Sequence, residues 1–302
     1  MLVGLGRAGT LAMDALGRRP DIELVAAIDL HPGKARARFP DGLSIRTSLV
    51  DLPNAEIAIV STPTPSHRTV CLELIERAPG LSLILCEKPG AMSAQHLEEL
   101  VGSARDRGVE LRVLLHYGFG SEVLWLAEHL SELGEVSSFS AAFEDPYGAA
   151  LAERTATLVS SWVDSGINAL TVLARLLEPT AVIDSRSPSA ESSRTELSFR
   201  CGSSSGTGVV TTSWRASMAR KSTCLTLVDD AVLDVDHLAG TVTHNGSTLY
   251  RAPPGDARVM RYRTMIAAHL DDAPTLLDEA TAMRLHALLA AAIEAQRSTR
   301  GA

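Results

Sequence analysis

Short apolar runs alternate with segments of helical periodicity along the first third of the chain. The apolar runs span Met1–Val3, Ile22–Ile28, Glu56–Val60, Leu81–Cys86 and Glu110–Leu115. Helical patterns lie between them, after the first run as far as Leu16 and near Pro65–Arg77 and Ser93–Arg107, where Ser93 is a suitable N-cap. Apolar strands separated by helices predict βαβ units and a parallel sheet that is buried on both faces.

The pattern changes after about Phe119. Ser/Thr-rich segments of alternating polarity predict antiparallel strands at Thr195–Arg200, Gly208–Trp214, Thr223–Val228, Ala231–Val235 and Thr241–His244. The dipeptide Asn245-Gly246 predicts a hairpin turn. Helices are expected at Glu122–Leu133, Ser160–Leu177, Met260–Leu270 and Asp278–Ala295. We therefore predict two domains, an α/β domain with a doubly wound parallel sheet over residues 1–118 and an α+β domain with an open antiparallel sheet over residues 119–302.

The segment Gly4-Leu5-Gly6-Arg7-Ala8-Gly9 matches the pattern G-x-G-x-x-G between a strand and a helix. The first glycine permits a tight turn, the second lets the backbone approach a pyrophosphate, and the third lets helix and strand pack closely. The N-terminus of the helix offers unpaired N–H groups to the phosphates. Gly4, Gly6, Arg7, Ala8 and Gly9 are therefore candidate cofactor-binding residues, and residues 1–118 are predicted to be a dinucleotide-binding Rossmann domain.

Asp29 ends the second predicted strand, about twenty residues beyond the glycines. A carboxylate at this place accepts hydrogen bonds from the adenosine ribose and repels a 2′-phosphate, which favours NAD(H) over NADP(H). His31, Lys34 and Arg36 follow closely, and their positive charge would shift the preference towards NADP(H).

Composition excludes several other classes of protein. The formal net charge is −8 and no run of Lys and Arg forms a basic patch, which argues against a nucleic-acid partner. The four cysteines have no metal-ligand spacing and no apolar run spans a bilayer, so we expect free thiols, no metal and a cytoplasmic location. The first strand is unusually short, and we expect a few residues to precede Met1.

Three further motifs contain candidate functional residues, two at strand ends of the predicted Rossmann domain and one in the second domain. Ser61-Thr62-Pro63-Thr64-Pro65-Ser66-His67 follows the third strand, Glu87-Lys88-Pro89 follows the fourth, and Asp164-Ser165-Gly166-Ile167-Asn168 lies in a helix of the second domain. Together they resemble the glucose–fructose oxidoreductase/inositol dehydrogenase family, Gfo/Idh/MocA. The resemblance covers nearly the whole chain, and the Asp164–Asn168 motif is most similar to the aldose 1-dehydrogenase branch that acts on arabinose or galactose.

The resemblance implies an NAD(P)-dependent dehydrogenase or reductase with two sets of site residues. The implied cofactor contacts beyond the glycines are Ser61, Thr62, Pro63, His67, Glu87 and Lys88. The implied active-site set is Lys88, His116, Asp164 and Asn168, with Lys88, Asp164 and Asn168 catalytic and a cis bond between Lys88 and Pro89.

The residues themselves are compatible with these roles. Ligands bind beyond the carboxyl ends of parallel strands, where Ser61, Glu87 and His116 lie. A partly buried lysine can exchange a proton near neutral pH, whereas an asparagine hydrogen-bonds a hydroxyl and does not titrate. We therefore expect Lys88 to exchange the substrate's hydroxyl proton while hydride moves to or from the nicotinamide, with Asp164 holding Lys88 and Asn168 binding a hydroxyl.

The chain departs from the branch in two places. Gly118 stands where an arginine is expected, and Glu144–Ser160 lacks the expected tryptophans, so Glu144 and Tyr147 are candidate substrate contacts by location alone. Three functions stay open: a sugar or polyol dehydrogenase, a biosynthetic reductase of a ketosugar or imine-type intermediate, and a non-catalytic NAD-binding sensor. Trp162 and Trp214 are interpreted as packing residues, although either is placed to line the substrate cleft. We expect a homo-oligomer, a dimer or a tetramer.

Overall fold

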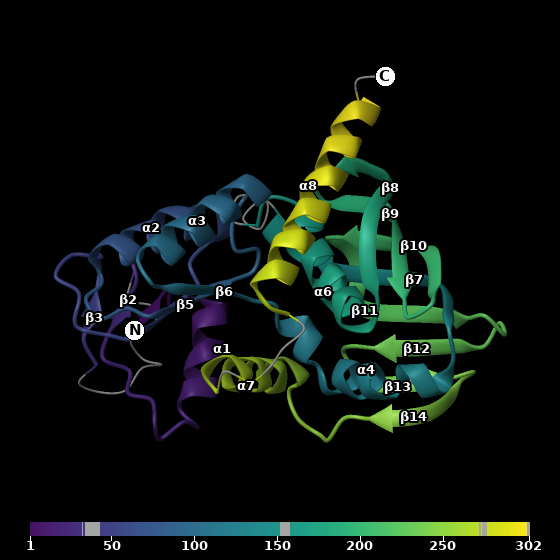
Figure 1. Ribbon diagram of the computed structural model, residues 1–302, viewed down its shortest axis with the longest axis horizontal. Helices are drawn as coiled ribbons and strands as arrows, with labels where there is room; N and C mark the ends of the chain where they lie inside the picture. The colour runs from purple at the N-terminus through teal and green to yellow at the C-terminus, as the bar shows by residue number, and fades with distance from the viewer. Residues whose placement is uncertain (32, 34–42, 152–157, 272, 274–276, 301–302) are drawn as a thin grey trace. The chain divides into compact units, whose positions relative to one another are not determined.

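The computed structural model describes residues 1–31, 33, 43–151, 158–271, 273 and 277–300, in two compact units (Figure 1). The first unit comprises Met1–Leu114 and Tyr262–Glu279, and the second comprises Leu115–Arg261 and Ala280–Ala302. The domain boundary expected after residue 118 lies close to this division, but the sequence reading assigned residues 262–279 to the second domain. Lys34 and Arg36, proposed to modify cofactor preference, lie outside the described residues.

A six-stranded parallel sheet forms the centre of the first unit. Its strands are β1 (Leu2–Val3), β2 (Ala27–Ile28), β3 (Ile45–Arg46), β4 (Ile57–Val60), β5 (Leu83–Glu87) and β6 (Glu110–Leu114). The spatial order is β3-β2-β1-β4-β5-β6, so the chain reverses direction across the sheet between β1 and β4. Such a reversal opens a crevice beyond the carboxyl ends of the two strands, and this fixes where a ligand can bind.

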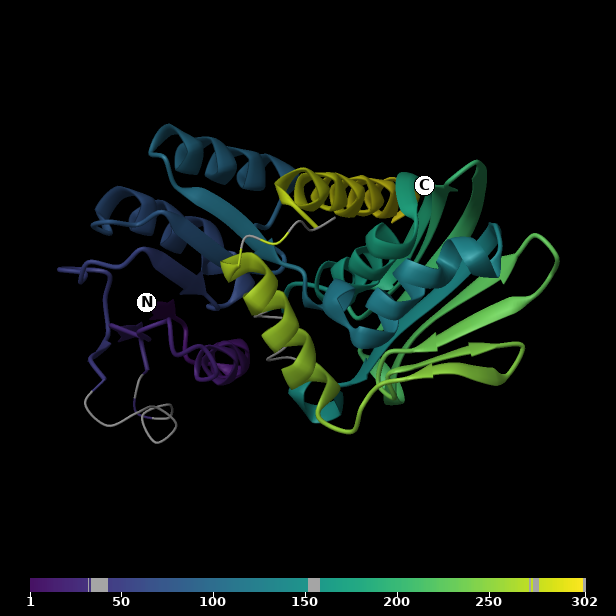
Figure 2. The ribbon, with the colours of Figure 1, turned by 60° about the horizontal axis from the view of Figure 1, so that its bottom comes forward.

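Helices cover both faces of this sheet (Figures 1 and 2). One face carries α2 (His67–Arg77), preceded by the 3-10 turn η3 (Thr64–Ser66), and α3 (Ala94–Asp106). The other face carries α1 (Arg7–Leu16) and α7 (Ala257–Leu270). The expected N-cap of α3 is confirmed, since the Ser93 hydroxyl accepts a hydrogen bond from the His96 N–H at 3.2 Å.

The second strand is shorter than predicted. Only Ala27 and Ile28 of the expected strand Ile22–Ile28 join the sheet, because β1 pairs with them through just Leu2 and Val3. An apolar pattern shows that a segment is buried, but a strand also needs backbone hydrogen bonds to a neighbouring strand. β3 was not predicted, since its two residues carry no pattern of their own.

The second unit contains an eight-stranded sheet in the order β14-β13-β12-β11-β7-β10-β9-β8. Its strands are β7 (Val136–Pro146), β8 (Glu178–Ser189), β9 (Ser192–Cys201), β10 (Ser204–Ser213), β11 (Arg215–Leu227), β12 (Val232–Asp236), β13 (Thr241–His244) and β14 (Ser247–Arg251). The expected antiparallel arrangement is confirmed except that β7 and β10 run parallel. Their carboxyl ends therefore lie side by side, with Glu144 opposite Ser213.

Helices pack on one face of this sheet in both views (Figures 1 and 2). They are α4 (Ser121–Leu133), α6 (Ile167–Leu176) and most of α8 (Glu279–Arg300). The described part of the unit also contains the 3-10 turns η4 (His116–Phe119) and η5 (Gly148–Ala150). The single helix expected over Ser160–Leu177 is instead a π-helix, η6 (Trp162–Gly166), that continues into α6. Trp162, Trp214, Phe143 and Phe199 are the largest fully buried side chains of this unit.

The expected hairpin turn after β13 is confirmed. Asn245 and Gly246 have φ values of 48° and 80°, the left-handed geometry that a two-residue hairpin requires. The structure also confirms that the four cysteines are free. None of the helices in the described part of the chain is both long and apolar enough to cross a membrane.

Burial in α8 makes the second unit sensitive to acid. Burial lowers the pKa of His286 from 6.5 to about 4, and its Nδ1 contacts the Ala282 carbonyl at 2.7 Å. The His286 imidazole therefore becomes protonated below about pH 6.5 in the unfolded chain, but only below about pH 4 in the folded chain. The contribution to the free energy of unfolding is complete above that window and falls by about 3 kcal/mol across it.

We expect the variant His286→Gln to lose less stability than the native chain on acidification, because glutamine does not titrate. Urea unfolding at a series of pH values between 7.5 and 4 measures this. Parallel pH profiles for the two proteins would show that His286 does not carry the effect.

Candidate functional site

The glycine loop between β1 and α1 is tightly packed at two of its three glycines. Gly4 has a φ of 92°, and a Cβ there would come within 2.6 Å of the Ser61 backbone. A Cβ on Gly9 would lie 2.1 Å from the Gly4 carbonyl oxygen. A Cβ on Gly6 would meet nothing within 4 Å, so the room beside Gly6 is open. The loop thus has the cradle expected of a pyrophosphate site, and no side chain caps α1 at Gly6.

Asp29 anchors this loop from the end of β2. One carboxylate oxygen accepts a hydrogen bond from the Leu5 N–H at 2.7 Å and the other accepts one from the His31 N–H at 2.7 Å. An ionised carboxylate accepts about four hydrogen bonds, so two backbone donors leave capacity for ribose hydroxyls.

Ser61 is buried at the end of β4 and ties that strand to the glycine loop. Its hydroxyl donates to the Gly4 carbonyl at 2.7 Å, with Val3 O at 3.2 Å. The sequence reading placed Ser61 among the cofactor contacts; in the structure its single proton is directed at the loop. Thr62 and Pro63 follow it at the carboxyl edge of the sheet.

His67, another predicted cofactor contact, is buried and joins two loops. Its Nδ1 lies 2.8 Å from the Pro89 carbonyl and its Nε2 lies 2.8 Å from the Thr62 carbonyl. Burial lowers the pKa of His67, the two carbonyls oppose this, and the Lys88 charge lowers it further. The ring therefore holds the loop after β4 against the loop after β5.

Glu87, Lys88 and Pro89 leave β5 at the same edge of the sheet. Glu87 is buried and accepts a hydrogen bond of 2.8 Å from the hydroxyl of Tyr262 on α7, a contact that sequence reasoning missed. Lys88 is half-buried, and the Lys88–Pro89 bond is cis, as the family resemblance implied. Glu87 thus fixes the strand end from which Lys88 projects.

In the second unit, Asp164 lies in the π-helix η6 and Asn168 in the first turn of α6, both buried. Single π-helical turns occur frequently at functional sites. Gly166 is required here, because a Cβ would come within 2.5 Å of the Trp162 ring. The Tyr147 hydroxyl lies 3.5 Å from Asp164 Oδ2, so the structure brings together Tyr147 and Asp164 of the predicted substrate set.

The neighbouring carboxylate on β7 is Asp145. Successive side chains of a strand point to opposite faces, so Glu144 and Asp145 face opposite sides of the sheet. Asp145 Oδ2 accepts hydrogen bonds from the Ser165 hydroxyl at 3.1 Å and from the ammonium of the buried Lys221 on β11 at 2.5 Å. Sequence reasoning singled out Glu144 and missed Asp145 and Lys221. The alternation of β11 carried a signal, because Lys221 shares a face with the apolar Leu225.

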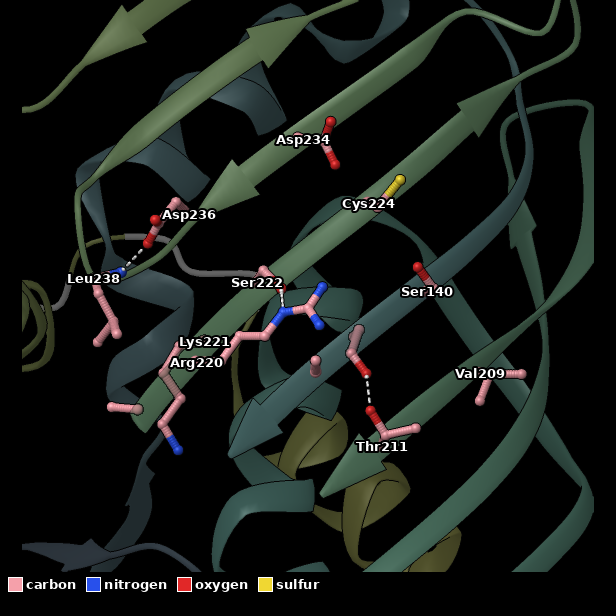
Figure 3. Close-up of a pocket in the computed structure, with 13 residues that line it drawn as sticks. Ser140, Val209, Thr211, Arg220, Lys221, Ser222, Cys224, Asp234, Asp236 and Leu238 are labelled. Atoms are coloured by element: carbon pink, nitrogen blue, oxygen red, sulfur yellow. Dashed lines mark hydrogen bonds between the residues drawn. The ribbon is translucent and has the colours of Figure 1, made fainter. Parts of the chain in front are cut away.

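Glu144 stands opposite Arg220 in the β7–β11 register. The outer face of the sheet, on which Arg220 lies, holds a hollow of about 420 Å³ (Figure 3). Its lining is mostly polar or small, and Arg220 Nε donates to the Ser222 hydroxyl at 3.2 Å. The structure thus separates Glu144 from the Asp164–Tyr147 pair.

The expected arginine is replaced at position 118 by glycine, and other cations occupy its surroundings. Arg175 on α6 donates through Nε to the Gly118 carbonyl at 3.1 Å, and the Arg261 guanidinium lies 4.3 Å from the centre of the Tyr117 ring. His116 is buried in the same turn, with its ring 4.8 Å from that of Tyr117. No group of three potential metal ligands occurs among the residues that the structure describes.

Comparisons with known proteins show what this chain is similar to. The model of an oxidoreductase family, NAD-binding Rossmann fold, matches residues 1–115. The pig trans-1,2-dihydrobenzene-1,2-diol dehydrogenase is 37% identical over 90 residues, 29% of this chain and 26% of that protein. The inositol 2-dehydrogenase of Rhizobium meliloti (strain 1021) is 27% identical over 151 residues, 48% of this chain and 44% of that protein. The matched segments thus span less than half the length of these curated relatives.

Solved structures share the whole fold. A putative myo-inositol dehydrogenase from Sinorhizobium meliloti 1021 has a TM-score of 0.78 at 18% identity, covering 99% of this chain and 97% of that one. Levoglucosan dehydrogenase in complex with NADH and levoglucosan has a TM-score of 0.77 at 15% identity, covering 98% and 96%. At such identities the likeness shows the fold.

A parallel sheet with a glycine loop at its topological switch point, followed by a sheet-and-helix unit, defines a two-part dinucleotide-binding protein. Residues 1–115 match the model of the Gfo/Idh/MocA oxidoreductase family with an NAD-binding Rossmann fold, which agrees with the resemblance and the cofactor expected from the motifs. The aldose 1-dehydrogenase branch and the individual site residues stay predictions.

The glycine loop allows a test that separates packing from cofactor binding. Gly9→Ala should cost about 2–3 kcal/mol of stability, because its Cβ meets backbone. Gly6→Ala should leave stability within about 1 kcal/mol and weaken NADH binding roughly tenfold, because its Cβ enters the open room of the loop. Urea unfolding and NADH fluorescence titration measure the two effects. If Gly6→Ala bound NADH as tightly as the native protein, the assignment of this loop as the pyrophosphate site would be wrong.

Proposed function

We propose that this protein is an NAD(P)-dependent oxidoreductase, with NAD(H) preferred, that transfers hydride between nicotinamide and the hydroxyl or carbonyl carbon of a sugar or polyol-like substrate. One observation carries the proposal: Lys88 leaves β5 at the same carboxyl edge of the parallel sheet that bears the glycine loop after β1. An ammonium at the same sheet edge as a dinucleotide cradle is an arrangement that suits a dehydrogenase.

The cofactor would be held by groups of the first unit. The N–H groups of the Gly4–Gly9 loop and the N-terminus of α1 would bind the pyrophosphate, and Asp29 would accept hydrogen bonds from the adenosine ribose. Thr62, Pro63 and Lys88 would lie along the nicotinamide half, with Ser61, His67 and Glu87 holding their loops. When bound, the nicotinamide supplies or accepts the hydride.

The chain's own residues would position the substrate and move its proton. Lys88 would take the proton of the reacting hydroxyl during oxidation and return it during reduction. Asp164, Asn168 and Tyr147 would hydrogen-bond hydroxyls, His116 would add a further contact, and Glu144 is retained from the sequence as a substrate candidate. The Lys221 ammonium compensates the Asp145 carboxylate next to this set, which limits repulsion of Asp164.

The names of similar proteins suggest the substrate class. Inositol, levoglucosan and trans-1,2-dihydrobenzene-1,2-diol are neutral cyclic compounds that carry adjacent hydroxyls. We propose that a neutral cyclic polyol of this kind is the substrate, and these three compounds are the natural first probes.

A second candidate is a biosynthetic reductase of a ketosugar or an imine-type intermediate. Glycine at position 118 favours this second candidate, because the aldose branch is expected to carry an arginine there. This candidate predicts NADH oxidation by such intermediates without turnover of simple polyols. A non-catalytic NAD-binding sensor predicts tight NADH binding without any turnover.

We further propose a cytoplasmic homo-oligomer, a dimer or tetramer, formed through the outer face of the eight-stranded sheet. In the part of the chain that the structure describes, helices cover the other face, and Met218, Val228 and Ile183 are exposed on the second unit. Light scattering after size-exclusion chromatography should give a mass at least twice the 32.1 kDa of one chain. A monomer mass at micromolar concentration would contradict the oligomer.

Replacing Lys88 tests the catalytic proposal. Lys88→Ala should lower kcat with the active polyol by about 10²–10⁴-fold, because the reacting proton loses its acceptor, and should weaken NADH binding far less than this. Absorbance at 340 nm measures turnover. Arg68→Ala, which removes an exposed ion pair with Glu99, is the control and should retain full activity. Unchanged kcat in Lys88→Ala would remove Lys88 from the mechanism.

A further inference from the structure

Two fully buried tryptophans of the second unit differ in one hydrogen bond. Trp162 donates its indole N–H to the Leu289 carbonyl on α8 at 3.2 Å. Trp214, which directly follows β10, is 0% exposed, yet its Nε1 meets no acceptor in the part of the chain that the structure describes. The two residues match in size and burial, so the missing acceptor is the property that distinguishes Trp214.

An indole N–H is a donor only, and buried tryptophans ordinarily pair it. A buried donor without a partner keeps the full cost of losing its water, which makes each such group in a native protein one that needs an explanation. A ligand that carries an acceptor to this donor removes the cost when it binds. The free energy of the new hydrogen bond then strengthens binding of that ligand.

Trp214 packs against Tyr147, a residue that the proposed function assigns to the substrate. Its ring centre is 5.6 Å from that of Tyr147, and its carbonyl accepts the Tyr147 N–H at 3.2 Å. Tyr147 is half-buried, and its hydroxyl lies 3.5 Å from Asp164 Oδ2. The parallel pairing of β7 with β10 produces this neighbourhood, since it places both carboxyl ends at one edge.

We propose that Trp214 is a specificity-determining residue whose indole N–H donates a hydrogen bond to a hydroxyl or carbonyl oxygen of the substrate. The half-buried Tyr147 then packs against the C–H face of a cyclic polyol, and Asp164 accepts from a hydroxyl on its rim. Because the N–H only donates, it selects for an oxygen with a free lone pair at that position. The inference rests on the proposed function, and it adds Trp214 as a hydrogen-bond donor to the proposed substrate site.

The test removes one N–H and leaves the ring. In the full-length protein, Trp214 is replaced by 3-benzothienylalanine, in which sulfur stands for the N–H, and Trp162 receives the same replacement as the matched control. The probe is whichever of inositol, levoglucosan and trans-1,2-dihydrobenzene-1,2-diol the native enzyme turns over with NAD⁺.

At position 214 we expect the KM of the probe to rise about threefold to tenfold, the worth of one hydrogen bond, with kcat within about twofold and an unliganded Tm that does not fall. At position 162 we expect the Tm to fall, because a made hydrogen bond is lost, and KM to stay unchanged. The encoded pair Trp214→Phe and Trp162→Phe gives a second comparison, with equal loss of ring volume and the larger loss of Tm at 162.

The outcomes separate the two proposals. An unchanged KM at 214 alongside the expected fall in Tm at 162 overturns the inference, since the N–H then faces water or nothing in the complex, and leaves the proposed function standing. A native protein that neither turns over nor is thermally stabilised by any of the three probes in the presence of NADH overturns the proposed polyol function, and the inference falls with it.

Discussion

Crowding of backbone at the glycine loop is the constraint on which the first unit depends. The loop passes so close to the end of β4 that Gly4 and Gly9 have no room for a Cβ, and the Ser61 hydroxyl and the Asp29 carboxylate hold it there. Three strand ends are thereby drawn to one loop. The N–H groups at the start of α1 are left without a side-chain cap, which is what makes this end of the helix receptive to phosphate.

Periodicity in the sequence predicted most helices and strands because burial imposes it. It failed where pairing decides the structure. Ile22, Leu24 and Val25 are apolar but lie outside β2, and β3 is too short to show a pattern. β7 was missed because its inner face carries Phe139 and Phe143 beside small and charged residues, so neither simple alternation nor a continuous apolar run marks it. The π-helix was read as an ordinary helix, since the extra residue of its turn leaves no separate signal.

The candidate site shows the same division. The glycines, Asp29, Lys88, Asp164 and Asn168 stand in motifs, so the sequence indicates them directly. The residues that hold the site in place do not stand in motifs, because the Tyr262–Glu87 and Lys221–Asp145 contacts join residues far apart in the sequence. Which of Glu144 and Asp145 faces Asp164 depends on the register of β7, and a sequence cannot fix that until the strand itself is known. The unpaired donor of Trp214 is visible only once every neighbour has been placed.

The excursion of α7 has a consequence for how the protein is made. Tyr262–Glu279 belong to the first unit, although the whole of Leu115–Arg261 separates them from its sheet. During synthesis the parallel sheet emerges first, yet the Tyr262 hydroxyl that donates to the Glu87 carboxylate leaves the ribosome only after Leu115–Arg261 of the second unit has been translated. In vectorial synthesis the first unit therefore becomes complete only when Tyr262–Glu279 has emerged, after all the strands of the second unit's sheet have been made.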